Sequence, residues 1–290
     1  MKKSIVVISL ALIVALFASM VAFAADFDKS KAISVVSREE GSGTRGAFIE
    51  LVGVQVKNDK GEKVDMTTED AIIANGTNIV MTTVASDTYG IGYISLGSLN
   101  DTVKAVNVDD VEPTVKNIQD GSYKVFRPFN IAYKGELSEV AQDFVNFILS
   151  AEGQAVVEEN KYIKVSEESP KFEGKNPAGK IVVGGSSSVT PLMEKLKEAY
   201  IAINSNAEIE IQLSDSTTGM TSAKDGILDI GMASRELKES ELEVLTPVVI
   251  ANDGIAIIVN LDNPIENLTS DQVRAIYVGE ITTWEQTEIN

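Results

Sequence analysis

The chain has 290 residues, of which 44% are hydrophobic and 23% are charged, which is the composition of a folded protein large enough for two lobes. Its 43 acidic and 25 basic residues give a formal net charge of −18, which argues against nucleic acid or an anionic membrane surface as the main partner. It contains no cysteine and no histidine, which excludes Cys/His zinc sites, thiol nucleophiles, Ser-His-Asp triads and imidazole bases. We therefore expect no metal, no cofactor and no enzymatic activity.

The first residues have the pattern of a cleavable signal peptide. Met1-Lys2-Lys3 precedes an apolar run over 5–21, and Ala22-Phe23-Ala24 then forms a small-residue cleavage site. This predicts a signal peptide over 1–24 and a secreted or periplasmic protein, with no cysteine for a lipid anchor. Because the apolar run is longer than usual for a signal peptide, an uncleaved membrane anchor is the alternative.

Beyond this segment, strand and helix patterns alternate, which is typical of α/β architecture. The predicted strands cover 33–36, 78–84, 91–95, 103–108, 123–133, 181–184, 208–213, 229–233 and 254–260. The predicted helices cover 46–52, 67–74, 138–149, 152–159, 191–203, 217–225 and 270–278. Residues 165–180 contain two prolines, two glycines and many charges without apolar periodicity, and we interpret them as a linker between two packed halves.

The loop 37–45 lies between the first predicted strand and the first predicted helix. Its glycines allow a tight turn, Ser42 and Thr44 supply hydroxyl donors, and the following helix points unpaired N–H groups at the same place. Arg38 and Arg45 add positive charge. These groups can bind an oxyanion through hydrogen bonds and positive charge, without a metal ion. An ordinary loop with a helix cap is the alternative, and for Arg38 the alternative is a surface pair with Glu39.

Three further loops, over 184–191, 214–219 and 231–236, follow predicted strands in the second part of the chain. Because ligands in open α/β sheets bind where the carboxyl ends of strands meet, we expect the four loops to lie close together. None contains the Gly-Lys-Ser/Thr of a phosphate loop, which argues against ATP or GTP chemistry.

Several of these segments together resemble a known family. They are S-R-E-E-G-S-G-T-R-G-A-F from residue 37, G-G-S-S-S-V-T-P-L-M from 184, D-I-G-M-A-S-R-E from 229 and A-N-D-G-I-A-I-I-V-N from 251. The chain resembles the extracytoplasmic phosphate-binding proteins that serve high-affinity ABC phosphate importers. The resemblance implies a two-lobed periplasmic-binding-protein fold of type II, inorganic phosphate held in the cleft between the lobes, and a membrane ABC permease as partner. We expect a monomer, with a lobe-swapped dimer as the alternative.

The order of the segments differs from the family, because the block at 184 normally precedes the block at 37. We interpret this as a circular permutation, which places the two chain ends close together. One lobe is then split, over 26–131 plus 253–290, and the other is continuous, over 132–252, with the linker 165–180 inside it. The strands that cross between the lobes are expected near 252–253 and 129–132.

The resemblance places phosphate contacts on both lobes. They are Arg38, Ser42, Gly43 and Thr44 in the split lobe, and Ser187, Ser188, Ser216 and Ser234 in the continuous lobe. Arg38 supplies the charge-assisted contact, and Glu40 matches an acidic position that orients it.

One departure from the family concerns selectivity. Many members have a Ser-Asp pair where this chain has Ala233-Ser234-Arg235, and that aspartate accepts a hydrogen bond from protonated phosphate and so rejects sulfate. Glu40 or Asp215 could take over this role, and Arg235 could be a second cation. One alternative is therefore a binder of another tetrahedral oxyanion such as sulfate. The other is a surface or interaction protein with the same fold, whose hinge the permutation has damaged.

Overall fold

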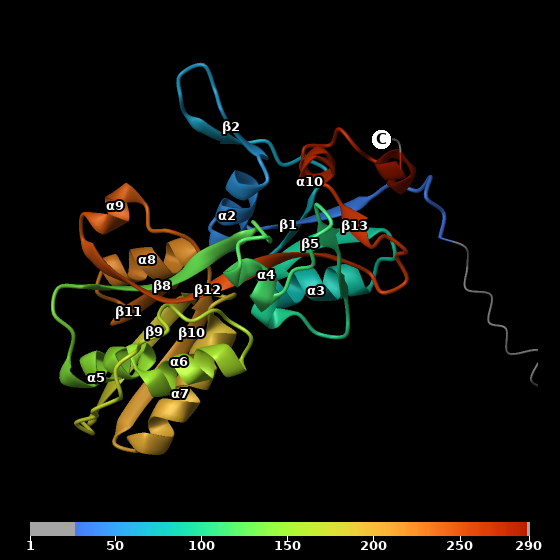
Figure 1. Ribbon diagram of the computed structural model, residues 1–290. Coiled ribbons are helices and arrows are strands. Elements are labelled where there is room, and N and C mark those ends of the chain that lie inside the picture. Colours follow the sequence, from blue (N-terminus) through green and yellow to red (C-terminus); the bar gives the residue numbers. More distant parts are fainter. Residues whose placement is uncertain (1–26, 289–290) are drawn as a thin grey trace, which may run out of the picture.

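A nine-stranded mixed sheet runs through residues 27–288, the part of the chain that the computed structural model describes (Figure 1). Its strand order is β10-β9-β11-β8-β12-β5-β1-β4, and β6 pairs with β12. The strands are β1 (Ser34–Arg38), β4 (Ile72–Ala74), β5 (Gly90–Ser95), β6 (Lys104–Ala105), β8 (Phe126–Lys134), β9 (Gly179–Ser186), β10 (Ala207–Ser214), β11 (Ile230–Ala233) and β12 (Leu245–Val259). Four short strands pair outside this sheet: β2 (Gln55–Lys57) with β3 (Lys63–Asp65), and β7 (Asn107–Val108) with β13 (Asn267–Leu268).

Helices cover the sheet as expected for an α/β protein. They are α2 (Gly43–Leu51), α3 (Thr77–Ala85), α4 (Val115–Gln119), α5 (Glu139–Leu149), α6 (Ala151–Glu159), α7 (Thr190–Ile203), α8 (Ser216–Lys224), α9 (Glu239–Leu242) and α10 (Ser270–Tyr277), with 3-10 turns η1 (Leu96–Ser98) and η2 (Trp284–Glu288). Helices α2 and α3 pack on β1 and β5, whereas α7 and α8 pack on β9, β10 and β11. No helix within residues 27–288 is long and apolar enough to cross a membrane.

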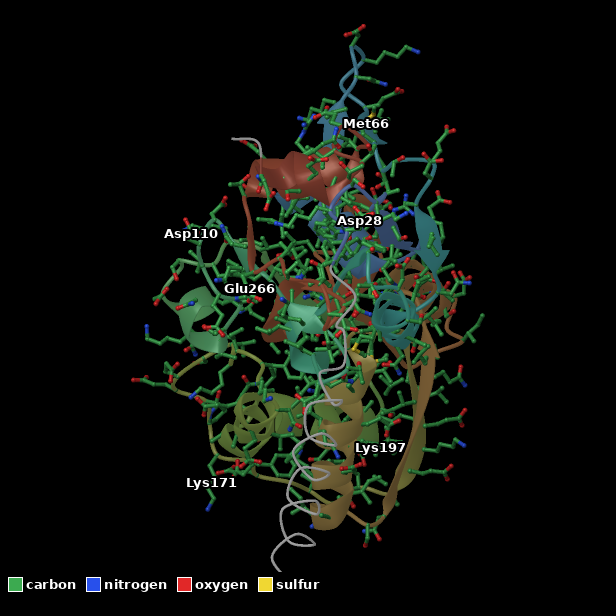
Figure 2. The ribbon with its side chains drawn as sticks, turned by 90° about the vertical axis from the view of Figure 1, so that its right-hand side faces the viewer. Asp28, Met66, Asp110, Lys171, Lys197 and Glu266 are labelled. Atoms are coloured by element: carbon green, nitrogen blue, oxygen red, sulfur yellow. The ribbon has the colours of Figure 1, made fainter. Side chains whose placement is uncertain are left out.

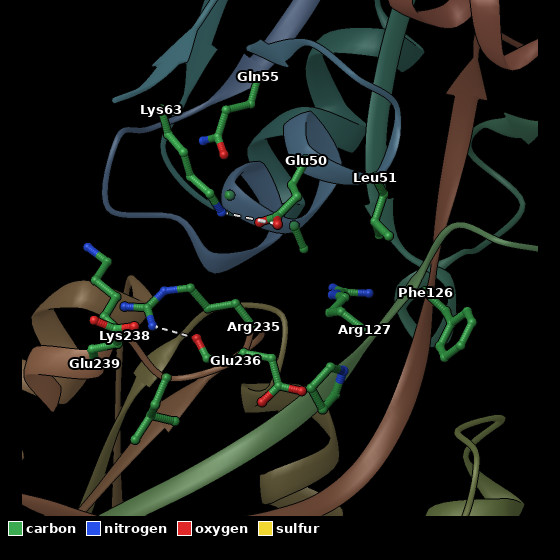
Figure 3. Close-up of a pocket in the computed structure, with 14 residues that line it drawn as sticks. Glu50, Leu51, Gln55, Lys63, Phe126, Arg127, Arg235, Glu236, Lys238 and Glu239 are labelled. Atoms are coloured by element: carbon green, nitrogen blue, oxygen red, sulfur yellow. Dashed lines mark hydrogen bonds and ion pairs between the residues drawn. The ribbon is translucent and has the colours of Figure 1, made fainter. Parts of the chain in front are cut away.

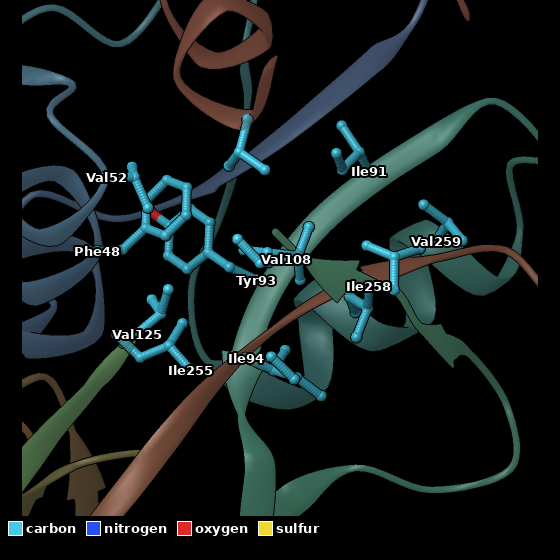
Figure 4. Packing of buried hydrophobic residues seen from close by; sticks show 14 of the residues in the cluster. Phe48, Val52, Ile91, Tyr93, Ile94, Val108, Val125, Ile255, Ile258 and Val259 are labelled. Carbon is cyan, nitrogen blue, oxygen red and sulfur yellow. The ribbon is translucent and has the colours of Figure 1, made fainter. Parts of the chain in front are cut away.

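The buried apolar residues form two main clusters. The first, which we call the split half, contains buried residues from Val35 to Val125 and from Ile255 to Trp284. Phe48 and Tyr93 stack at its centre, with ring centroids 3.9 Å apart (Figure 4). The second, the continuous half, contains most of those from Phe129 to Ala251; Ile163 packs in the first cluster instead, and a small third cluster around Met220 falls in the same residue range. The side chains in Figure 2 show Met66 of the first half and Lys171 and Lys197 of the second toward opposite ends of the molecule.

Two long antiparallel strands join the halves. Strand β12 pairs with β8 from Leu245 to Gly254 and then with β5 from Ile255 to Val259, and a register shift occurs between Val249 and Ala251. The core contacts change at the start of β8: Val125, just before this strand, packs in the split half, and Phe129 packs in the continuous half. The crossing on β8 therefore lies slightly before the expected 129–132, because Phe129 and Ile131 already pack in the continuous half.

The first and last described segments lie side by side, as expected from the segment order. Ala32 forms a bridge with Thr283, and the N–H of Ile33 donates to the carbonyl of Thr282 at 2.8 Å. The predicted signal peptide over 1–24 lies outside the described residues.

Two element predictions were wrong. Residues 67–74 do not form a helix, because 72–74 is strand β4, parallel to β1. Residues 78–84 do not form a strand but lie in α3, where Val80, Met81 and Val84 are buried at helical spacing. The β-branched side chains favoured a strand locally. Tertiary packing overrides that preference, because Gly92 of β5 leaves room for α3: a Cβ there would lie 2.7 Å from Val80 Cγ1.

The segment 165–178 is irregular, as predicted, but it does not connect the two halves. It joins α6 to β9, which both belong to the continuous half, and it packs over the helices there. Phe172 contacts Phe147 edge to face at 5.3 Å, and its N–H donates to Glu152 at 2.8 Å. The linker interpretation is therefore corrected to a packed cover segment within one half.

Candidate functional site

Four helices begin at the boundary between the halves, and their N-termini converge. Helices α2 and α3 come from the split half, and α7 and α8 come from the continuous half. Hydroxyl side chains at or just before the starts of α2, α3 and α7 lie within hydrogen-bond distance of hydroxyls from the other half, and Ser216 at the start of α8 joins them through Ser234. Because the N-terminus of a helix carries unpaired N–H groups and a partial positive charge, this arrangement favours an anion.

The hydroxyl groups form one buried cluster across the boundary. We call it the hydroxyl cluster, and its members are Thr44, Thr77, Ser186, Ser187, Ser188, Ser216 and Ser234. The Ser188 hydroxyl lies 2.8 Å from that of Thr44 and 3.0 Å from that of Thr77. The Ser234 hydroxyl lies 3.2 Å from that of Thr44, 3.0 Å from that of Ser186 and 3.5 Å from that of Ser216. The structure thus brings together five predicted residues, Thr44, Ser187, Ser188, Ser216 and Ser234.

Arg38 reaches the cluster from the end of β1 and is only 2% exposed. Its guanidinium donates to the Ser187 hydroxyl at 3.0 Å and to both carboxylate oxygens of Glu39, at 2.6 and 2.7 Å. The prediction that Glu40 orients Arg38 is wrong, because Glu40 is exposed and Glu39 forms the ion pair with the guanidinium instead. The second oxygen of Glu39 also accepts from the N–H of Gly76 at 3.2 Å, which fixes this carboxylate in place.

Ser42 and Gly43 contribute in different ways. The Ser42 hydroxyl caps α2 by accepting from the N–H of Arg45 at 3.2 Å, so the structure does not place it in the hydroxyl cluster. Gly43 is a point of close approach between the halves. A Cβ on Gly43 would lie 2.9 Å from the Ser234 hydroxyl and 3.1 Å from Cγ of Arg235, and closer still to the Ser216 hydroxyl. Only glycine allows these groups to come so near.

Three other charged candidates are engaged elsewhere. Asp215 caps α8 by accepting from the N–H of Thr218 at 2.9 Å. Arg45 donates to Asp65 at 2.9 Å and to the backbone carbonyl of Arg38 at 2.7 Å, and its side chain has no hydrogen bond to the cluster hydroxyls. Arg235 binds both oxygens of Glu241 at 2.8 Å, beside a groove of about 750 Å³ (Figure 3). Each of these charges is held by its own partner.

The pKa values around the cluster follow from burial and pairing. Burial raises the pKa of Tyr93, whose hydroxyl lies 2.9 Å from that of Ser37 and accepts from the N–H of Arg38 at 3.1 Å. Burial also acts to raise the pKa of Glu241, but the Arg235 hydrogen bonds and the backbone N–H of Lys238 together lower it below its ordinary value.

Two residues of the site were missed in the sequence. Thr77 lies in the cluster and follows Gly76, but the sequence pattern predicts a strand directly after it, over 78–84, and so does not reveal the start of α3. Arg127, on β8, donates to the Thr44 hydroxyl at 3.1 Å and pairs with Asp253. For Thr77 the sequence contains a signal, namely a glycine followed by a hydroxyl residue before an apolar run. For Arg127 it contains none, because a single arginine inside a strand has no distinctive pattern.

The arrangement supplies hydrogen-bond donors. The first N–H groups of α2, those of Gly43 and Thr44, have no acceptor among the residues that the structure describes. Together with the hydroxyls and Arg38, they can surround an oxyanion. Within residues 27–288, no group of three or more carboxylates is placed to hold a metal ion.

Comparison with known proteins adds independent evidence. A family model described as "PBP superfamily domain" matches residues 21–152 and 171–290. The phosphate-binding protein PstS 2 of Streptococcus agalactiae is 53% identical over 254 residues, which are 87% of this chain and 86% of the relative. The crystal structure of a phosphate-binding protein of a phosphate ABC transporter from Streptococcus pneumoniae superposes with a TM-score of 0.70 at 43% identity, over 89% of this chain and 100% of that chain. The phosphate-binding protein PstS of Bacillus subtilis is 30% identical over 126 residues, 42% of each chain.

Proposed function

Because the chain belongs to the PBP superfamily and, within it, to the family of the phosphate-binding proteins PstS, we propose that it captures inorganic phosphate and passes it unchanged to a membrane ABC permease. The observation that carries this proposal is the buried hydroxyl cluster, on which four helix N-termini and Arg38 converge from both halves. Phosphate presents four oxygen atoms, and a site built from donors on two sides can enclose it.

Each residue then has a definite task. Arg38 gives a charge-assisted hydrogen bond, the hydroxyls of Thr44, Ser187, Ser188, Ser216 and Ser234 donate to the phosphate oxygens, and the N–H groups of Gly43 and Thr44 donate from the start of α2. Ser42 acts indirectly, by capping that helix. Glu39 holds the Arg38 guanidinium in position.

We infer that the two halves are the two lobes of the protein, with the lobes 26–131 plus 253–290 and 132–252 adjusted so that β8 crosses between residues 125 and 129. The separate hydrophobic clusters and the two strands that join them support this division. Closure of such lobes around a ligand is a known hinge motion, for which periplasmic binding proteins are a standard example. A monomer then suffices to enclose phosphate, and extracytoplasmic capture fits the predicted signal peptide.

Calorimetric titration of the purified protein with inorganic phosphate, and then with sulfate, tests the proposal. We expect one phosphate per chain, and a loss of about 10²-fold in affinity in Arg38→Gln, since a hydrogen bond to a charged group is worth about 1.5–3 kcal/mol. Arg274→Gln is the control, because Arg274 belongs to the same half but pairs with Glu280 at the surface, away from the cluster. A folded protein that gives no heat with phosphate, or equal losses in both variants, would contradict the proposal.

We also infer that the segment order is a circular permutation relative to the wider family. The alignment with the Bacillus subtilis relative covers 42% of each chain, as expected when one collinear alignment can match only one of two exchanged blocks. The adjacent first and last described segments provide the geometry. Joining residue 288 to residue 27 by a short linker, and opening the chain within 165–178, should preserve folding and phosphate affinity. A rejoined chain that folds but does not bind would refute the inference.

A further inference from the structure

Arg127 occupies an unusual position at the crossing between the halves. It lies on β8 directly opposite Asp253 of β12, and the two side chains are 3% and 0% exposed and form an ion pair. The same guanidinium nitrogen donates to the carbonyl oxygens of Asp253 and Gly254, at 3.2 and 2.8 Å. The guanidinium is therefore fixed to both crossing strands.

The other edge of the guanidinium contacts the hydroxyl cluster. One nitrogen donates to the Thr44 hydroxyl at 3.1 Å, and Nε donates to the carbonyl oxygen of Ser234 at 3.3 Å. Thr44 belongs to the split half, whereas Ser234 follows β11 of the continuous half. One buried side chain thus contacts both crossing strands and one residue of the site from each half. Figure 3 shows Arg127 between the elements of the two halves.

These contacts determine the direction of the Thr44 hydrogen bond. A hydroxyl has one proton, and a guanidinium can only donate. Because Thr44 accepts from Arg127, its own proton is available to another acceptor, and the neighbouring oxygens are the hydroxyls of Ser188 and Ser234, at 2.8 and 3.2 Å. The proton is therefore directed into the hydroxyl cluster, where the anion would lie.

We propose that Arg127 is a positioning residue, which presents the Thr44 hydroxyl as a donor to the bound anion and ties the site to the crossing strands. This inference rests on the proposed function. Arg127 acts on the anion through Thr44, and this role requires the several N–H donors of a guanidinium rather than a positive charge alone.

The test compares variants in which no buried charge is left unpaired, since removing one partner of a buried ion pair is itself strongly destabilising. In Arg127→Met combined with Asp253→Asn, both charges are removed, and the new amide oxygen can still accept from the N–H of Gly97, as the Asp253 carboxylate does at 3.2 Å. We expect this double variant to fold and to bind inorganic phosphate at least about 10-fold more weakly than the unaltered protein.

Thr44→Val supplies the second arm of a double-mutant cycle. Because Arg127 acts through Thr44, adding Thr44→Val to the double variant should cause less further loss than Thr44→Val causes by itself. Wild-type affinity in the folded double variant, or losses that simply multiply, would overturn the inference.

Arg127→Lys keeps a positive charge opposite Asp253. It tests the inference even if the double variant does not fold. We expect it to fold and to bind phosphate clearly more weakly, because an ammonium cannot span Asp253 and Thr44 together. Full affinity in Arg127→Lys would overturn the inference. Failure of the unaltered protein to bind phosphate would instead refute the proposed function, and so the two failures are distinguishable.

Discussion

Replacing Gly43 by alanine tests the close approach of the two halves while leaving every charge and hydroxyl in place. The added Cβ would lie 2.9 Å from the Ser234 hydroxyl, a distance that real Cβ atoms essentially never show, and closer still to the Ser216 hydroxyl. Either the hydroxyls must rotate out of their hydrogen bonds, or the halves must separate by at least about 0.5 Å to restore ordinary contact, and both changes disrupt the donors that would surround the anion.

The expected effect on binding follows from the donors that are lost. A hydrogen bond to a charged group contributes about 1.5–3 kcal/mol, and losing the equivalent of one or two of them weakens phosphate binding by about 3 kcal/mol. This corresponds to about 10²-fold in affinity. Helix α2 itself does not oppose the change, because alanine is preferred over glycine in helices by up to about 1 kcal/mol and Gly43 has no left-handed backbone angle, so any loss of fold stability comes from the clash between the halves.

Calorimetric titration and thermal unfolding of Gly43→Ala and Gly46→Ala provide the comparison. Gly46 lies one turn along the same helix, but a Cβ there would be 3.9 Å from Arg235, which is ordinary contact. We expect Gly46→Ala to bind phosphate like the unaltered protein. Unchanged affinity in Gly43→Ala would show that the two halves do not approach in this way when phosphate is bound, and it would refute the reasoning.

Three further predictions concern individual contacts. Glu39→Gln should weaken phosphate binding about 10-fold, because it loosens the Arg38 guanidinium, whereas the exposed Glu40→Gln should have no effect; equal effects by calorimetry would contradict the assignment. Because the pKa of Glu241 is lowered below its ordinary 4.5, its carboxylate stabilises the fold above that pH, and this contribution disappears as the pH falls through the lowered pKa. Urea unfolding of the unaltered protein should therefore lose more stability between about pH 7 and pH 3 than that of Glu241→Gln, and parallel losses would count against the pairing with Arg235. Phe172→Ala should cost about 2 kcal/mol and speed proteolytic cleavage within 165–178 without changing phosphate affinity; unchanged cleavage would show that this contact does not hold the cover segment in place.

The helices and strands that the sequence predicted well are those with a clear apolar period or a clear cap. Helix α5, for example, starts where Ser138 caps it and buries one face from Val140 to Ile148. The prediction failed for helix α3, because its β-branched residues favour a strand. Only the tertiary structure shows that they pack against Gly92 of β5, which has no side chain. Local propensity could not reveal that partner.

The site was predictable to the extent that each residue lies next to a helix start. The loops could be found because strand, glycine or serine loop, and helix follow one another in sequence, and the resemblance to the phosphate-binding proteins then singled out Ser187, Ser188 and Ser216 within them. The choice between Glu39 and Glu40 could not be made, since it depends on the N–H of Gly76, which approaches from a distant loop. Arg127 depends on the antiparallel register of two crossing strands, and no local pattern encodes that register.

Both guanidinium groups at the hydroxyl cluster have a carboxylate partner of their own, Glu39 for Arg38 and Asp253 for Arg127. The formal charges of these four side chains cancel, and the chain as a whole carries −18, so an approaching anion meets no long-range attraction beyond a Debye length of about 8 Å. A bound anion must then be held by short-range hydrogen-bond donors, and its binding free energy depends on how many of its oxygen atoms accept hydrogen bonds at the same time. Such a site favours a tetrahedral oxyanion over a spherical ion such as chloride, because only the oxyanion presents several oxygen atoms at once.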